Sequence, residues 1–448
     1  MLARSRGDIG RCVALSREVL ALLPDVEAAR RSAAMLNLAR AYLVSGDVTP
    51  VSERLALDAI GPVQASGNWI GHLSALANLA QLQALQGRLH AAAATYRRAA
   101  AIPTGPGGLK ALGSGAASYY IGLSSLHYEW NELRLAEEHL SDGMELVQGP
   151  LTIDADVVAR GYITRARIQH AWGDGAAARA TLEEFVAVAS ERGFAAHIVD
   201  AADALQARLA LAGGDLLAAM RWADQSGLEQ RHAMEFTRRT ACATLVRVRI
   251  AQALAASSAA SGHDLGPTVG LLNALAENAQ AGGRMGHLVE ILTLHALALQ
   301  VQGDSRGARR DLERALQLAA PEGYVRIFAD DGLPIAALLR RAQLARIAPA
   351  YVEMLVRVFR TGSEAVATRP GSTPSLDAHA PAPVIELPTS RELDVLRLIA
   401  AGKSNAEIAQ MLVIAISTVR THTNNIFSKL GVTRRTEAVA RARELDLL

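Results

Sequence analysis

A cluster of basic side chains lies near the C-terminal end of this 448-residue sequence. Between Ala415 and Arg443 a single acid, Glu437, is outnumbered by six cations: Arg420, Lys429, Arg434, Arg435, Arg441 and Arg443. Guanidinium and ammonium groups gathered in this way neutralise the phosphates of nucleic acid. A solvated basic face is the plainer alternative, and the elements that carry the charges decide between the two.

Four short helices are predicted to position these charges. Thr389–Glu392 and Ser404–Glu407 both fit the capping box, in which a hydroxyl accepts from the amide three residues on and the Glu reaches back. Gly402 suits the end of the first helix, and a turn at 413–416 leads into a third helix at about 417–430. A helix, a short turn and a helix form the scaffold that places its second helix in the major groove of DNA.

Together these features resemble the LuxR-type DNA-binding domain over Thr389–Leu448. The residues that carry the resemblance are Arg391, Glu392, Val395, Leu396, Ile399, Ala400, Gly402, Ser404, Asn405, Glu407, Ile408, Ala409, Thr418, Val419, Arg420, His422, Asn425, Ile426, Lys429, Leu430, Gly431, Val432, Arg435, Ala438 and Val439. The resemblance implies a four-helix fold that binds double-stranded promoter DNA, a homodimer on that DNA, and RNA polymerase as a further partner.

The resemblance also assigns roles to individual positions. The residues that it implies read base edges are Arg420, Thr421 and Asn424, since Arg suits guanine and Asn suits adenine. The residues that it implies contact phosphate are Ser404, Asn405, His422, Lys429, Arg434 and Arg435. For His422, packing is the alternative to a phosphate contact. Dimerisation is expected through the fourth helix, at Ala438, Val439 and Ala442.

Turn signals recur along the first 330 residues at a nearly constant spacing. The turn residues are Gly46, Gly87, Asn131, Gly173, Gly214 and Gly303. The first four steps measure 41, 44, 42 and 41 residues, and the last, of 89, is about two periods. A Ser- and Gly-rich break at 256–266 falls near the middle of that long step. A fixed period of this length is typical of proteins built from stacked repeats.

The residues after each turn keep the same register. Small residues stand five positions after the last five turns, at Ala92, Ala136, Ala178, Ala219 and Ala308. Apolar residues stand nine positions after the same turn residues, at Tyr96, Leu140, Leu182, Ala223 and Leu312. With helical spacing on both sides of the turn, each unit is predicted to be a helical hairpin. The array resembles the tetratricopeptide repeat and implies an all-α solenoid whose concave face binds an unknown ligand or protein.

Other residues give little sign of chemistry. The four tryptophans are predicted to pack between hairpins, with a ligand groove as the alternative: Trp69, Trp130, Trp172 and Trp222. Gly105–Gly108 lacks the spacing of a phosphate loop and is predicted to be a loop between repeats. The 12 His and 2 Cys lack ligand or disulfide spacing. We therefore expect no metal, no cofactor and no catalytic residue, so the protein is not expected to be an enzyme.

The chain is predicted to have three parts. These are a repeat domain at 1–360, a Pro-rich linker at 361–386 and a helix-turn-helix domain at 387–448. The stretch 323–332 is predicted to end the array, with a turn at 330–332. No secretory signal and no sufficiently apolar span is visible, so we expect no membrane contact and a cytoplasmic location.

The combination of repeats, the 323–332 stretch and the LuxR-type tail resembles the large ATP-binding, maltose-regulon activator-like LuxR-type regulators. Those proteins carry an N-terminal nucleotide-binding domain, whereas no Walker A sequence occurs here. The chain resembles that architecture without its ATPase domain, and it is not expected to bind ATP. The sequence thus predicts a regulator in which a repeat sensor controls a DNA-binding tail. The alternative is a repeat scaffold whose tail docks protein.

Overall fold

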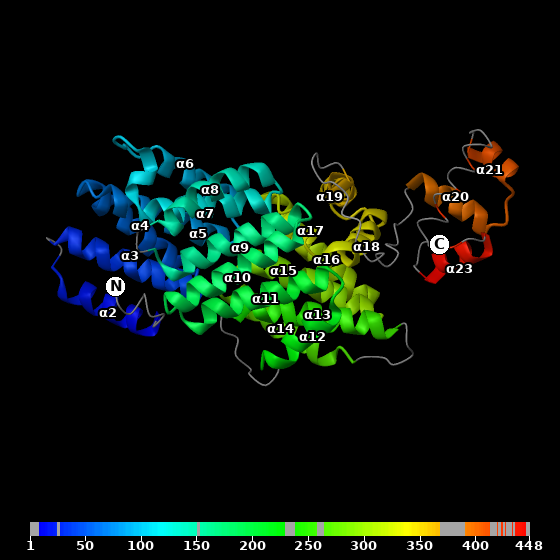
Figure 1. The fold of residues 1–448 in the computed structure, drawn as a ribbon, viewed down its shortest axis with the longest axis horizontal. Coiled ribbons are helices and arrows are strands. Elements are labelled where there is room, and N and C mark those ends of the chain that lie inside the picture. The colour runs from blue at the N-terminus through cyan, green and yellow to red at the C-terminus, as the bar shows by residue number, and fades with distance from the viewer. Residues whose placement is uncertain are drawn as a thin grey trace. The chain divides into compact units, whose positions relative to one another are not determined.

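The computed structural model describes residues 9–24, 27–149, 153–228, 238–257, 264–367, 390–412, 419, 423, 426, 432 and 435–444. The chain divides into two compact units, residues 1–369 and 370–448, which are described separately (Figure 1). All regular elements in the described ranges are helices, with no β-strand among them. The predicted all-α class is therefore confirmed.

Seven helical hairpins can be followed through the described part of the first unit, preceded by α2 (Ile9–Leu22). The first helices of the hairpins are α3 (Ala28–Ser45), α5 (Trp69–Leu85), α7 (Ser114–Glu129), α9 (Ala155–Ala171), α11 (Ala196–Ala212), α13 (Arg239–Ser257) and α15 (Met285–Val301). The second helices are α4 (Pro50–Ala65), α6 (Leu89–Ala100), α8 (Leu133–Gln148), α10 (Gly175–Glu191), α12 (Leu216–Gln225), α14 (Gly266–Ala281) and α16 (Ser305–Ala319). The predicted repeat is confirmed, and the break at 256–266 joins α13 to α14.

The turn residues end one helix and their neighbours begin the next. All six predicted turn residues have positive φ, from 63° at Asn131 to 89° at Gly303, a conformation in which Gly carries no Cβ penalty. After three of these turns an aspartate caps the following helix. Asp174, Asp215 and Asp304 each accept from the amide three residues on, at 2.9–3.0 Å. In these Gly-Asp pairs the Gly ends the first helix and the Asp caps the start of the second.

The small residues of the repeat are buried where the hairpins stack. Ala92, Ala136, Ala178 and Ala219 are 0% exposed and Ala308 is 2% exposed. The residues four positions further on are buried as well, so the predicted register is confirmed. Residues 103–107 form a loop between α6 and a 3₁₀ turn (Gly108–Leu112), as predicted.

Three of the four tryptophans pack as predicted. Trp69, Trp130 and Trp222 lie partly buried against the main core, and the Trp130 indole N–H donates to the Glu322 carbonyl at 2.9 Å. Trp172 differs, because it is 37% exposed and lines a cavity. Packing between hairpins is therefore not found at that position, and the alternative of a ligand groove stays a prediction there.

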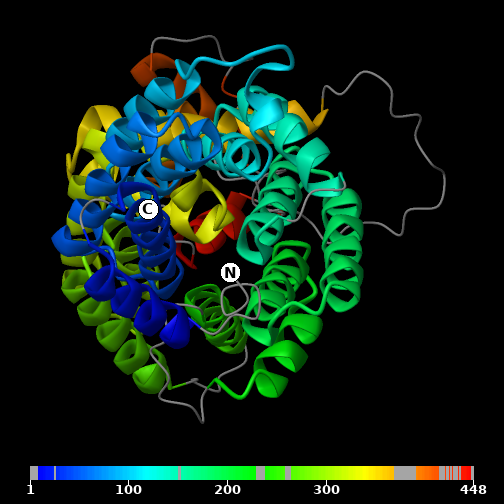
Figure 2. The same ribbon diagram turned by 90° about the vertical axis from the view of Figure 1, so that its left-hand side faces the viewer.

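The hairpins close into a ring. Arg284, just before α15, donates to the Gly46 carbonyl in the α3–α4 turn at 2.9 Å. A Cβ built on Gly87, in the α5–α6 turn, would lie 2.8 Å from Cβ of Met285. Figure 2 shows the hairpins of this unit arranged around a central space, which we call the lumen. The first helices of the hairpins line the lumen.

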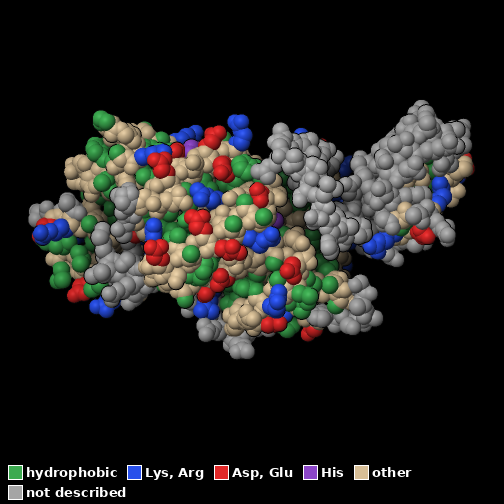
Figure 3. Space-filling view, in the orientation of Figure 1, with side chains coloured by type: hydrophobic (Ala, Val, Ile, Leu, Met, Phe, Trp, Pro, Cys, Tyr) green, Lys and Arg blue, Asp and Glu red, His purple; other side chains and the backbone are tan. Residues whose placement is uncertain are grey.

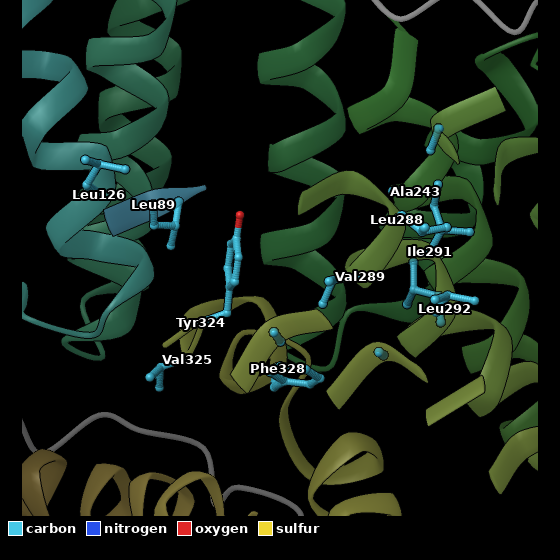
Figure 4. Packing of buried hydrophobic residues seen from close by; sticks show 14 of the residues in the cluster. Leu89, Leu126, Ala243, Leu288, Val289, Ile291, Leu292, Tyr324, Val325 and Phe328 are labelled. Atoms are coloured by element: carbon cyan, nitrogen blue, oxygen red, sulfur yellow. The ribbon is translucent and has the colours of Figure 1, made fainter. Parts of the chain in front are cut away.

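The 323–332 stretch enters the lumen after α16 and the short 3₁₀ turn η3 (Ala320–Glu322). It forms α17 (Arg326–Ala329), seen near the centre of the ring in Figure 2, and leads into α18 (Gly332–Leu344). The Val325 amide donates to the Glu129 carbonyl at 2.8 Å. In Figure 4, Tyr324 and Phe328 lie between Leu89 on one side and Val289 on the other. The segment therefore ties α6 and α7 to α15 across the ring.

Gly122 on α7 permits a close approach by Tyr96 of α6. A Cβ at position 122 would lie 1.9 Å from the Tyr96 hydroxyl oxygen and 2.7 Å from Cζ. Tyr96 is 1% exposed, so its ring or α7 would have to shift to make room for the Cβ. We expect Gly122→Ala to lower the free energy of unfolding by about 1–3 kcal/mol, measured by urea unfolding.

Gly270 on α14 provides a matched control, since it is exposed and no atom lies within 4 Å of the Cβ position there. Gly270→Ala should stabilise the protein by about 0.5–1 kcal/mol, because Ala is the better helix former. If Gly122→Ala stabilised the protein as Gly270→Ala does, the tight packing of Tyr96 on α7 would be refuted.

The last helix of the first unit, α19, spans Pro349–Ala367. Residues 361–367 are therefore helical, although the linker was expected to begin at 361. The reason is local, since Glu364–Ala367 are compatible with a helix and the first proline is Pro370. A residue before proline is restricted away from helical backbone angles.

Candidate functional site

The C-terminal unit has a small helical core. Its described helices are α20 (Ser390–Ala400), α21 (Asn405–Leu412) and α23 (Arg435–Glu444). The residues buried together in this core are Val395, Leu396, Ile399, Ile408, Ala409, Val419, Ile426, Ala438 and Ala442. These residues come from all three described helices and from positions 419 and 426, so one core joins the described parts of the module.

The turn between α20 and α21 has the predicted chemistry. Gly402 ends α20 with φ of 79°. The Glu407 carboxylate accepts from the Ser404 amide at 2.8 Å, and the Glu407 amide donates to the Ser404 hydroxyl at 3.3 Å. This reciprocal pair is the capping box expected from the sequence. The first predicted box, at Thr389, begins outside the described residues.

Three described residues belong to the predicted third helix: Val419, Thr423 and Ile426. All are helical and buried, and the Thr423 hydroxyl donates to the Val419 carbonyl at 2.8 Å. Val419 and Ile426 therefore contribute to the core of the module. The spacing of the three marks one face of a helix that points into the core.

Most of the predicted DNA contacts lie outside the described residues. These are Arg420, Thr421, His422, Asn424, Lys429 and Arg434, together with the side chain of Asn405. Ser404 is exposed at the start of α21, as a phosphate contact requires. Arg435 donates to the Lys403 carbonyl, an interaction that the sequence did not indicate, and it thereby joins α23 to the α20–α21 turn.

The predicted dimer contact needs correction. Ala438 and Ala442 are fully buried against the other helices of their own module. They are small because α23 packs closely on α20, so neither can form the surface of a partner contact. Val439 is only partly buried. A dimer formed through α23 would use another side of this helix, where Glu437 is exposed.

The turn at 330–332 carries two buried acids inside the first unit. Asp330 accepts from the Tyr128 hydroxyl at 2.8 Å and pairs with Arg326 at 2.5 Å and Arg167 at 3.2 Å. The Arg167 guanidinium also lies 4.3 Å from the centre of the Tyr128 ring. The side chain of Asp330 is only 6% exposed, so this charge is held by its partners rather than by water.

Asp331 has its own set of partners. Arg247 donates to both carboxylate oxygens of Asp331, at 2.6 and 2.9 Å, and Arg208 donates at 3.0 Å. Arg247 also donates to Glu290 at 2.8 Å. Two-pronged contacts of this kind are the geometry that the planar guanidinium favours. We call the set around Asp330 and Asp331 the lumen charge network.

The charge network follows the repeat. Glu129, Arg167, Arg208, Arg247 and Glu290 lie on α7, α9, α11, α13 and α15, separated by 38, 41, 39 and 43 residues. Each occupies the lumen side of the first helix of its hairpin. Comparing charged residues at the repeat period would have revealed this row. The repeat pattern was defined by the turns and the second helices alone, and the row of charges lies on the first helices.

Burial and charge act against each other in this network. Burial raises the pKa of Asp330, but Arg326, Arg167 and Arg208 outweigh it and hold that pKa well below its usual range. Arg247 similarly overcomes burial and lowers the pKa of Glu290 to about 2. Both carboxylates are therefore charged at neutral pH. On the outer face drawn in Figure 3, acidic and basic side chains are instead interspersed.

Two cavities adjoin the network. One, of about 460 Å³, is lined by residues of the first helices and by Tyr324, and we call it the arginine cavity. The other, of about 1070 Å³, is lined mainly by apolar residues of α9, α11, α13, α15, α18 and α19, and we call it the apolar cavity. Both are bordered by Arg167, Arg208 and Arg247, so the network separates them. Their sizes suit small molecules.

The fold and the site define a helical-repeat protein with a helix-turn-helix DNA-binding module. The family model described as MalT-like TPR region matches residues 1–345. The family model described as Bacterial regulatory proteins, luxR family matches residues 388–442. The chain therefore belongs to the MalT-like TPR-region family and carries a luxR-family domain, which makes it a DNA-binding regulator of transcription. Both families are regulatory rather than catalytic.

The described residues hold neither a metal site nor a membrane span. Within those ranges, no three His, Cys, Asp or Glu side chains are placed to hold a metal ion. None of the helices described is long and apolar enough to cross a membrane. Cys12 and Cys242 are buried and unpaired with each other.

Proposed function

We propose that the chain is a sensor-regulator, in which the state of the repeat domain controls promoter binding by the C-terminal module. The core of that module is the observation that best supports DNA binding. Val419, Thr423 and Ile426 fix one side of the third helix inward, and the capping box begins the helix before it. This leaves the opposite side of the third helix to face the major groove. Such a regulator acts on cytoplasmic DNA.

Helical periodicity supports the choice of base-reading residues. With about 3.6 residues per turn, an ideal third helix is expected to place positions 421 and 424 away from the face of positions 419, 423 and 426, and position 420 about 90° from that face. We propose that Arg420 and Asn424 read base edges there, with Thr421 beside them. Lys429, Arg434 and Arg435 would neutralise phosphates, with Ser404 and Asn405 at the start of α21.

The repeat domain offers a route from a bound ligand to the tail. Val358 and Phe359 of α19 line the apolar cavity, and α19 is the last helix before the segment that leads to the DNA-binding module. A ligand in the apolar cavity can therefore touch α19, the last helix of the repeat domain in sequence. We propose that this contact is the physical link between sensing and promoter binding, with a homodimer as the DNA-bound form.

Two substitutions test the assignment of the reading face. Arg420→Ala is expected to weaken binding at the cognate site by about 1–3 kcal/mol and to relax its specificity, because a base contact is lost. Lys429→Ala is expected to weaken binding to all sequences alike, because phosphates carry no sequence information. Fluorescence anisotropy with cognate and scrambled duplexes measures both.

Arg310→Ala is the control, since that side chain is 76% exposed on the repeat domain and should leave DNA binding unchanged. If Lys429→Ala relaxed specificity while Arg420→Ala weakened all sequences equally, the reading face would be wrongly assigned. Binding to protein but to no duplex would favour a scaffold whose tail docks protein.

A further inference from the structure

The apolar cavity owes its space to small residues that recur with the repeat. Each of the helices α9, α11 and α13 carries a network arginine and, four positions later, an alanine. All of these residues line the cavity: Arg167 and Ala171, Arg208 and Ala212, Arg247 and Ala251. Residues four positions apart share one face of a helix, so each alanine lies on the lumen face with its arginine. Three neighbouring helices thus present methyl groups where larger side chains would fill the space.

Large apolar side chains of the same cavity are exposed to solvent. Trp172 is 37% exposed, Leu254 is 43% exposed and Leu333 is 56% exposed, and all three line the cavity. Single exposed apolar residues are ordinary, but several that meet at one concave surface are typical of a binding site. The volume of about 1070 Å³ is close to the upper end of the range for small-molecule sites. Size and exposure therefore both favour a bound small molecule.

The charged side chains that line this cavity are already paired with one another. Each of four lining arginines lies within 3.2 Å of Asp330 or Asp331: Arg167, Arg208, Arg247 and Arg326. Glu129 and Glu290 add further carboxylates to the same network. Burial is the main cause that lowers the pKa of His170 in the same wall, so this ring is neutral at neutral pH. A charged ligand would lose its hydration here without finding a free counter-charge, a cost that an uncharged molecule avoids.

Aromatic side chains complete the wall. Tyr128, Trp172 and Phe359 line the cavity, the last of them from α19. Aromatic side chains bury large apolar areas and pack favourably against other rings. We propose that the apolar cavity binds an uncharged, apolar small molecule that contains a ring system and packs against Ala251, Trp172 and Phe359. The proposal rests on the sensor function above and gives its ligand a chemical class.

The test is a fluorescence titration of the full chain with two dyes that share one ring system. The first, N-phenyl-1-naphthylamine, is uncharged, whereas 8-anilino-1-naphthalenesulfonate carries a sulfonate on the same skeleton. Both dyes brighten in apolar surroundings. We expect the uncharged dye to bind saturably, with one molecule per chain. The sulfonate should bind at least about tenfold more weakly, because its charge would be buried beside arginines that already have partners.

Variants with matched controls locate the site. Ala251→Phe fills the cavity and Leu254→Lys places a charge in its wall, so each should weaken binding of the uncharged dye at least about tenfold. Ala187→Phe on α10 and Leu217→Lys on α12 make the same changes at exposed positions that line neither cavity, and should not change it. Since Leu254 is partly exposed already, Leu254→Lys should fold and covers the case of an unfolded Ala251→Phe.

Four results would overturn the proposal. The first is no saturable binding of the uncharged dye, and the second is sulfonate binding that is as tight. The third is binding that persists unchanged in both Ala251→Phe and Leu254→Lys. The fourth is a chain that sediments as a dimer and becomes monomeric in Leu254→Lys, which would assign this surface to a second copy.

DNA affinity, measured on the same samples, separates this proposal from the sensor function. Dye binding without any change in DNA affinity would contradict sensing through this cavity but leave the apolar site standing. Intact DNA binding without dye binding would contradict the apolar site and leave the DNA-binding regulator standing.

Discussion

Asp330→Ala is expected to lower the free energy of unfolding of the repeat domain by about 3–5 kcal/mol. The substitution removes the carboxylate that holds Arg326, Arg167 and the Tyr128 hydroxyl together. The arginines would remain buried without their counter-charge, and that uncompensated burial costs more than the pair itself contributes. Urea unfolding followed by circular dichroism measures the change.

Two further substitutions separate the effect of the charge of Asp330 from that of its side chain, and the effect of a buried ion pair from that of an exposed one. Asp330→Asn keeps a hydrogen-bond acceptor for Tyr128 but removes the charge, so it should destabilise less than Asp330→Ala. Asp58→Ala removes an acid whose pair with Arg54 lies on the surface of α4, and exposed pairs contribute about 0–1 kcal/mol. A loss at Asp330 no larger than the loss at Asp58 would show that the lumen charge network does not hold the ring together.

DNA affinity is expected to fall about 10³-fold as NaCl rises from about 50 to about 200 mM. The proposed dimer would place Lys429, Arg434 and Arg435 of both copies on phosphates, about six cations in all. Each phosphate that is neutralised releases condensed counterions. A plot of the logarithm of the binding constant against the logarithm of the salt concentration should therefore have a slope of about −5. Anisotropy titrations at four or five salt concentrations give the slope.

Lys429→Ala should reduce the magnitude of that slope by about 1 per copy. Arg310→Ala, on the exposed surface of the repeat domain, should leave it unchanged. Affinity that varies less than about tenfold over this range would count against phosphate contacts by the tail. A slope near half the predicted value would instead indicate that one copy binds, and would contradict the proposed homodimer.

The repeat could be predicted because its turns impose strict demands on residue type. Positive φ at Gly87, Gly173 and Gly214 favours Gly, and close stacking of hairpins leaves room only for small residues such as Ala92 and Ala136. Both constraints recur in five of the seven hairpins and are visible in a single sequence. The same holds for the Ser404–Glu407 capping box, whose two partners lie within one turn.

Ring closure could not be predicted, since it depends on how small rotations between hairpins accumulate. The contact between Arg284 and Gly46 joins residues that are 238 positions apart, so no local sequence pattern predicts it. Long separations in sequence also hide the lumen charge network, since Asp330 lies 202 residues from Tyr128 and 163 residues from Arg167. Asp330 looked like part of an ordinary turn, and only the closed ring brings it to Tyr128 and Arg167.

The dimer contact was misassigned for a related reason. Ala438 and Ala442 lie on an apolar stripe of α23, and an apolar stripe on a terminal helix is compatible with either a partner or the module's own core. In a module this small, the core needs every apolar residue that it can bury. The structure assigns both alanines to that core.

Binding of the full chain to matched DNA duplexes tests the central claim most directly. One duplex is a promoter fragment recovered by crosslinking from genomic DNA, and the other is a scrambled duplex of equal length and composition. We predict that the chain binds the promoter fragment at least about 10³-fold more tightly near physiological salt, as sequence-specific regulators do. Equal affinity for the two duplexes, or binding to neither at low salt, would contradict a tail that reads DNA sequence.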